Sequence, residues 1–129
     1  MRITENGCAV SRIVLGCRAT WLETHAAEQL RDAVERLSGA RLLLTYEQDT
    51  CPSKGGTILV GRASTHEGIA RRVAEADFPP ESQEENDCVI LYAQDETLIL
   101  SGTNERSVYY SVFHLLQTHF HVGFYFDGD

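Results

Sequence analysis

The strongest constraint on the fold is a pair of apolar stripes at helical spacing. The first opens with a capping box at Thr20 and Glu23, in which the hydroxyl caps a free N–H and the carboxylate reaches back. It ends at Ser38-Gly39, where glycine can take the left-handed conformation that closes a helix. The second covers residues 105–120. Each stripe is a single apolar arc, so each helix needs another surface to pack against. The apolar positions are Leu22, Ala26, Leu30, Ala33, Val34 and Leu37 in the first stripe, and Val108, Tyr109, Val112, Phe113, Leu115, Leu116 and Phe120 in the second.

Short apolar runs bounded by turn residues predict the strands. Asn6-Gly7 is a strong hairpin signal, because both central positions of a type I′ turn need a positive φ. It predicts a hairpin of residues 2–5 and 9–15. Ser64 and Glu67 could cap a weaker helix. The remaining elements are this helix over 65–76, strands at 41–46, 57–61 and 123–126, a second hairpin at 88–92 and 97–101, and polar loops at 47–56 and 77–87.

The order of these elements defines the fold class. Helices and strands do not alternate strictly, which argues against a doubly wound sheet. The sequence predicts an α+β fold with a mixed β-sheet and the two main helices packed on one face. A chain of 129 residues suffices for one domain, so residues 1–129 are expected to form a single α/β unit.

Composition excludes several classes of partner. The formal net charge is −8, with 19 acidic against 11 basic residues, which argues against nucleic acid and against an anionic membrane surface. No run approaches the roughly 20 apolar residues that span a bilayer, and the N-terminus turns polar too early for a signal peptide. We expect a cytoplasmic protein. The cysteines, at positions 8, 17, 51 and 88, form no Cys-x-x-Cys pair; free thiols, with Cys8, Cys17 and Cys88 as small apolar fillers, are favoured over two disulfides.

The sequence contains no recognisable set of catalytic residues. His119 and His121 could bind a metal, but cationic residues at a helix C-terminus are the simpler interpretation. The turn Gly102-Thr103-Asn104 could present a helix N-terminus to a small anion, or simply cap the helix. Gly-x-Ser-x-Gly is absent, and the acidic residues of the loops, such as Glu85 and Asp95, are expected to be solvated. We therefore predict no catalytic residue, cofactor or metal.

Several segments, taken in order, resemble one known domain. They are Ile3 to Leu15, Ala26-Ala27-Glu28-Gln29-Leu30, Leu37-Ser38-Gly39-Ala40 and Ile58-Leu59-Val60-Gly61. The most specific are Leu98 to Gly102, Val108 to Leu116 and Gly123 to Gly128. Together they resemble the non-catalytic N-terminal α/β domain of α-glucuronidase-like bacterial glycoside hydrolases. That domain is similar to the one preceding the barrel of β-hexosaminidases. Asp127 stands where the family has a proline.

The resemblance implies an accessory role. In such enzymes the domain precedes a catalytic (β/α)8 barrel and packs against it. The acid and base carboxylates of the family lie in that barrel, so no catalytic residue carries over to this chain. This chain alone is therefore expected to hydrolyse no glycoside. The implied partners are therefore the barrel of the same full-length protein and, through the parent enzyme, a carbohydrate substrate.

The second helical stripe is broader than one sheet requires. On a wheel of about 100° per residue its apolar positions span roughly 160°, whereas a helix on one sheet needs about 100°. Tyr109, Tyr110 and Phe113 of this helix are therefore candidate interface residues, facing either the barrel or a second copy of the chain in a homodimer. Trp21 of the first helix is a further candidate. Alternatively, residues 62–87 fold over this face. A free-standing ligand-binding or regulatory module is the rival class, and a weak enzyme is the third.

Overall fold

The computed structural model describes residues 4–5, 8–9, 11–49, 56–73, 81, 88–94 and 96–119, and its elements follow closely the order expected from the sequence. The strands are β1 (Thr4–Glu5), β2 (Cys8–Ala9), β3 (Ser11–Leu15), β4 (Leu43–Tyr46), β5 (Gly56–Val60), β6 (Val89–Gln94) and β7 (Thr97–Gly102). The helices are α1 (Trp21–Ser38), α2 (Glu67–Val73) and α3 (Glu105–His119), with a 3-10 turn at Glu47–Asp49.

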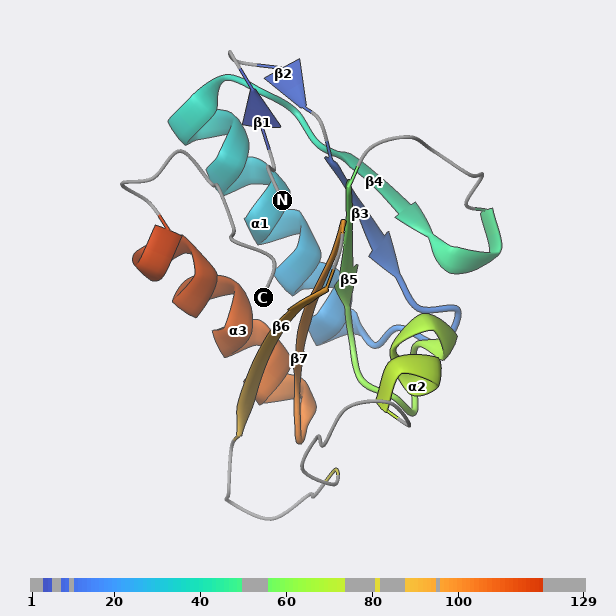
Figure 1. Ribbon diagram of the computed structural model, residues 1–129. Helices are drawn as coiled ribbons and strands as arrows, with labels where there is room; N and C mark the ends of the chain where they lie inside the picture. Colours follow the sequence, from blue (N-terminus) through green and yellow to red (C-terminus); the bar gives the residue numbers. More distant parts are fainter. Residues whose placement is uncertain are drawn as a thin grey trace.

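Five strands form one mixed sheet in the order β4-β3-β5-β7-β6 (Figure 1). β3 pairs in parallel with both β4 and β5, and β5 pairs in parallel with β7. β6 runs antiparallel to β7 at the edge, as a hairpin predicts. In register, Ile13 of β3 faces Ile58 of β5, which faces Leu98 of β7. This row of branched side chains crosses the centre of the sheet.

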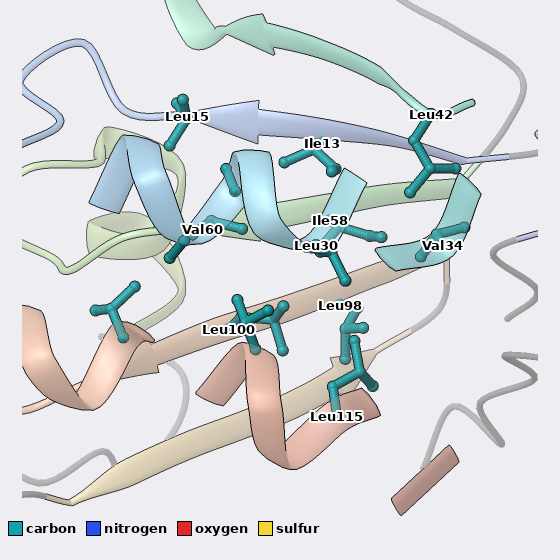
Figure 2. Packing of buried hydrophobic residues seen from close by; sticks show 14 of the residues in the cluster. Ile13, Leu15, Leu30, Val34, Leu42, Ile58, Val60, Leu98, Leu100 and Leu115 are labelled. Carbon is teal, nitrogen blue, oxygen red and sulfur yellow. The ribbon is translucent and has the colours of Figure 1, made fainter. Parts of the chain in front are cut away.

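Helices α1 and α3 pack side by side on one face of this sheet (Figure 1). Side chains from alternate strand positions meet the apolar stripes of both helices, and Figure 2 shows their closely packed cluster. The prediction of a mixed sheet with the two main helices on the same face is therefore confirmed. The buried layer consists of Ile13, Leu15, Ala26, Ala27, Leu30, Val34, Leu42, Ile58, Val60, Ala93, Leu98, Leu100, Val108, Val112 and Leu115.

The short helix α2 covers the opposite face of the sheet. Its Ile69 packs with Val14, Leu59 and Ile99, which alternate along their strands with the residues of the first layer. The central strands are therefore buried on both faces, which explains their continuous apolar runs. Because α2 lies on this side, the described part of residues 62–87 does not cover the outer flank of α3.

Some local predictions were wrong. The run predicted as one strand at residues 9–15 contributes to two strands. β2 pairs with β1 in a small separate hairpin, whereas β3 joins the five-stranded sheet in parallel pairing. β3 has a parallel partner on each side and therefore lies inside the sheet, whereas a hairpin would have given it one antiparallel neighbour. Cys17 and Cys88 are exposed free thiols rather than apolar fillers. Residues 120–129, with the expected strand at 123–126, as well as Cys51, lie outside the described residues.

The cap of α2 also differs from the prediction. Ser64 does not cap it, because the Ser64 hydroxyl donates a hydrogen bond to Glu81 (2.6 Å). Instead the ring of His66, just before the helix, accepts a hydrogen bond from the backbone N–H of Gly68 at 3.1 Å. The other two helices begin as expected. Thr20 and Glu23 form the capping box of α1, and the side chain of Asn104 accepts from the N–H of Ser107 at the start of α3.

We expect the central row of the sheet to dominate the free energy of unfolding. Replacing the fully buried Ile58 by alanine should lower it by about 2–5 kcal/mol, because a cavity is left between the sheet and the two helices. Leu43→Ala is the control, since that side chain on the edge strand β4 is 63% exposed. Its change should stay within about 0.5 kcal/mol. Urea denaturation measures both, and equal losses would contradict this assignment of the core.

Candidate functional site

The candidate site lies where the parallel strands end. The loop after β3 leads to α1 on one face of the sheet, and the loop after β5 leads to α2 on the other face. The loop after β7 returns to the first face and leads to α3. Figure 1 shows the beginnings of α1 and α3 at the same end of the sheet as α2. In open α/β sheets, ligands bind where successive connections leave on opposite faces, at the carboxyl ends of the strands.

A buried carboxylate joins these loops. Glu23 is fully buried in the first turn of α1. Its Oε1 accepts a hydrogen bond from the backbone N–H of Thr20 at 3.0 Å. Its Oε2 accepts from Nε of Arg62 at 2.8 Å and from the hydroxyl of Thr65 at 3.1 Å. The capping-box residue expected from the sequence therefore also fixes the loop after β5, which lies 39 residues further along the chain.

The loops after β3 and β5 also touch directly. The backbone N–H of Arg18 donates to the carbonyl of Thr65 at 3.2 Å, and its Nε donates to the carbonyl of Ser64 at 3.1 Å. A Cβ atom on Gly16 would overlap the Thr65 carbonyl oxygen. Glycine at position 16 is therefore required by close approach of the two backbones.

A shallow groove opens beside this network. Its volume is about 420 Å³, within the range of small-ligand sites. It lies between the first turns of α1 and α3 and the loop after β5. The guanidinium of Arg62 is held on one side by Glu23, and its Nη1 lies 3.8 Å from Oε1 of Glu81. The lining residues are Thr20, Arg62, Asn104, Glu105 and Arg106.

On the other side of the network, His66 and Glu47 form a second polar cluster. Nδ1 of His66 accepts from the N–H of Gly68, so Nε2 carries the proton and donates to the carbonyl of Val14 at 3.1 Å. Both ring nitrogens are therefore engaged, and His66 cannot act as a general base for another residue. Burial lowers the pKa of His66, more strongly than its bond to Val14 and the nearby Glu47 carboxylate raise it.

The same cluster restrains Glu47 and Cys17. Partial burial raises the pKa of Glu47, but hydrogen bonds from the backbone N–H groups of Cys17 (2.7 Å) and Glu67 (3.1 Å) outweigh it and lower the pKa. Desolvation and the hydrogen bond and negative charge of Glu47 raise the pKa of the Cys17 thiol. Because both ring nitrogens of His66 are engaged by Val14 and Gly68, the ring is not available to deprotonate this thiol.

The four candidate interface residues lie together along the α1–α3 seam. The rings of Trp21 and His25 stack at 5.1 Å and 7°, and those of His25 and Tyr109 stack at 5.8 Å and 15°. Tyr109 then meets the ring of Phe113 edge-on at 4.9 Å and the ring of Tyr110 at 6.3 Å. Trp21, Tyr110 and Phe113 are 77%, 48% and 39% exposed, and Tyr109 is half-buried. The exposure of Tyr110 and Phe113 is the one expected for the outer flank of the second helical stripe. The sequence did not predict that His25 completes the row.

No group of three His, Cys, Asp or Glu side chains in the described part of the chain could hold a metal ion. The ring of His119 and the whole of His121 lie outside it. Of the helices described, none is both long enough and apolar enough to cross a membrane.

A similar fold occurs as a small part of a longer solved chain. Among solved structures, the chain is similar to a family GH115 4-O-methyl-α-glucuronidase with specificity for decorated arabinogalactans. The TM-score is 0.58 and the sequence identity 14%; the match covers 83% of this chain and 13% of that chain. The chain thus spans a small fraction of that protein's length, and the likeness concerns the fold. No protein family profile and no curated protein matches the sequence.

We expect the buried ion pair of Glu23 and Arg62 to be important for stability. Glu23→Gln should lower the free energy of unfolding by about 2–4 kcal/mol, because the partly buried Arg62 loses the carboxylate that holds its Nε. Glu35→Gln is the matched control, since Glu35 pairs with Arg41 at 3.0 Å on the exposed surface and its loss should cost under about 1 kcal/mol. Denaturant unfolding compares the two. Similar small losses would show that Glu23 serves only as a helix cap.

The buried neutral His66 predicts a pH dependence. Its folded pKa lies below the ordinary value of 6.5, so the unfolded chain takes up a proton that the folded chain resists. Stability should be at its full value above about pH 6.5 and fall as the pH drops from there towards the folded pKa. In His66→Asn, the side-chain oxygen can still accept from the N–H of Gly68, but the side chain no longer titrates. The part of the pH dependence of stability that is due to His66 should therefore disappear. Denaturant unfolding between pH 5 and 8 measures this, and an unchanged slope would contradict it.

Proposed function

We propose that this chain is a non-catalytic accessory domain of a glycoside hydrolase, which packs against the catalytic barrel of the same protein. Two independent features support the proposal. The sequence segments resemble such a domain in their order. The fold matches over 83% of this chain a piece that is only 13% of a glucuronidase. A piece of that size within a long enzyme is compatible with a supporting domain.

The observation that carries the proposal is the outer flank of α3. The inner side of this helix is fully buried through Val108, Val112 and Leu115. On the outer side Tyr110 and Phe113 are exposed, joined through Tyr109 into one aromatic patch. Exposed aromatic side chains that form one contiguous patch often mark a surface where another protein or domain binds. In the proposed assembly the barrel covers this flank.

The polar groups at the strand ends support a non-catalytic role. Glycosidases of the usual kind need two carboxyl groups that flank an open cleft and reach the substrate. Within the described residues, the two most buried acids of this edge are committed to the fold. Glu23 binds Arg62 and Thr65, and Glu47 accepts from two backbone N–H groups. We therefore assign the hydrolytic chemistry of the parent protein to its barrel.

The patch can be tested by comparing the 129-residue chain with the longer protein. The double substitution Tyr110→Ser and Phe113→Ser should make the longer protein lose at least about 2 kcal/mol more stability than the isolated chain does, since only the former loses a packed interface. Thermal and urea unfolding of both proteins give the difference. Leu43→Ser, at an exposed apolar side chain on the far edge of the sheet, should affect the two alike.

Two results would overturn the proposal. One is an equal loss of stability in both proteins, which would mean that α3 contacts no second domain. The other is a gene in which no catalytic barrel adjoins this segment. In that case the exposed flank would serve a different partner, such as a second copy of the chain.

A further inference from the structure

The aromatic row ends in an open ring at the start of α1. Trp21, His25 and Tyr109 stack with nearly parallel planes, so one face of the indole packs on His25. The rest of the indole is in solvent, and 77% of the residue is exposed. An exposed tryptophan held by a stack of rings has little conformational freedom left to lose on binding. It presents a flat and rigid apolar surface.

This surface begins beside the polar groove. Trp21 directly follows Thr20, which lines the groove, and Tyr109 lies one helical turn after Glu105, which also lines it. The row of rings thus begins at the residue next to Thr20, at the edge of a groove of about 420 Å³ whose lining includes the planar polar groups of Arg62, Asn104 and Arg106. The guanidinium of Arg62 is pre-oriented by its bond to Glu23. Rigid groups lose less entropy when they bind a ligand.

The charges of the groove decide which ligand fits. Arg62 is already neutralised by the buried Glu23 and lies close to Glu81, and the lining otherwise carries one negative side chain, Glu105, and one positive side chain, Arg106. The side chains of the groove therefore give it no net positive charge that would select an anion. Its donors and acceptors instead suit a ligand with many neutral hydroxyl groups. The C–H face of a sugar ring carries partial positive charge and packs well on the negative face of an indole.

We infer that the groove of Thr20, Arg62, Asn104, Glu105 and Arg106, together with the indole of Trp21, is a binding site for a neutral saccharide. A sugar ring stacks on Trp21, and its hydroxyl groups bond to the groove. The inference goes beyond the proposed accessory function, and its biological role rests on that function. The groove lies at the first turn of α3 and the proposed docking flank on the following turns, so a bound glycan would lie near the domain junction, where ligand sites are common.

Fluorescence offers a direct test, because Trp21 is the only tryptophan in the chain. The 129-residue protein is titrated with soluble arabinogalactan, xylo-oligosaccharides and cello-oligosaccharides, and with free glucuronate as an anionic comparison. At least one neutral saccharide should give a saturable shift of the emission to shorter wavelength, since the sugar removes water from the indole. Glucuronate should give no saturable change beyond that of a neutral monosaccharide.

Variants then locate the site by calorimetry or NMR titration. Trp21→Ala and Arg106→Ala should each weaken binding about tenfold or more, and both residues are exposed enough for the fold to tolerate the change. Leu43→Ala controls for the loss of an exposed apolar side chain, and Arg36→Ala for the loss of an exposed arginine at the far end of α1. Both controls should bind as the original chain does.

Three outcomes would overturn the inference: no saturable change with any neutral saccharide, tighter binding of glucuronate than of every neutral saccharide, or equal effects of the site and control variants. None of these depends on the barrel, because the titrations use this chain alone. Conversely, the double substitution Tyr110→Ser and Phe113→Ser could destabilise the longer protein no more than the isolated chain. The docking proposal would then fail, but the saccharide measurements would be unaffected. The two proposals therefore fail separately.

Discussion

Burial of the central strands on both faces is the constraint on which the rest of the structure depends. Ile13, Ile58 and Leu98 point to the side of α1 and α3, and their neighbours along the strands point to α2. Helices are therefore needed on both sides of one sheet. The connections after β3 and β5 must then leave in opposite directions, and this opens the crevice at the carboxyl ends of the strands.

The buried polar side chains described above lie at that crevice, and their hydrogen bonds mostly stabilise the fold. Glu23 and His66 are buried and fully engaged, and each joins loops that are distant in the sequence. Such groups are costly to bury unless they are paired, so their bonds fix the loops in one arrangement. This edge also carries the shallow groove and the stacked tryptophan on which the proposed saccharide site depends.

The two proposals use neighbouring parts of one aromatic row. The Tyr110 and Phe113 end lies on the flank of α3, where a barrel would pack, and the Trp21 end adjoins the groove. Aromatic residues serve both purposes because they combine a large apolar surface with few rotatable bonds. A domain that supports a barrel and holds a glycan near it would combine both effects.

The sequence by itself determined the elements, the helix caps of α1 and α3, the mixed sheet and the exposure of Tyr110, because periodicity and capping are local properties of the chain. It did not reveal that β3 leaves its hairpin for parallel neighbours, that Glu23 binds Arg62, or that His25 lies between Trp21 and Tyr109. The parallel pairing of β3 with β5 joins residues 45 positions apart, such as Ile13 and Ile58, which no short turn connects. Only the tertiary structure decided these contacts, because they form when the packed sheet and helices bring distant segments together.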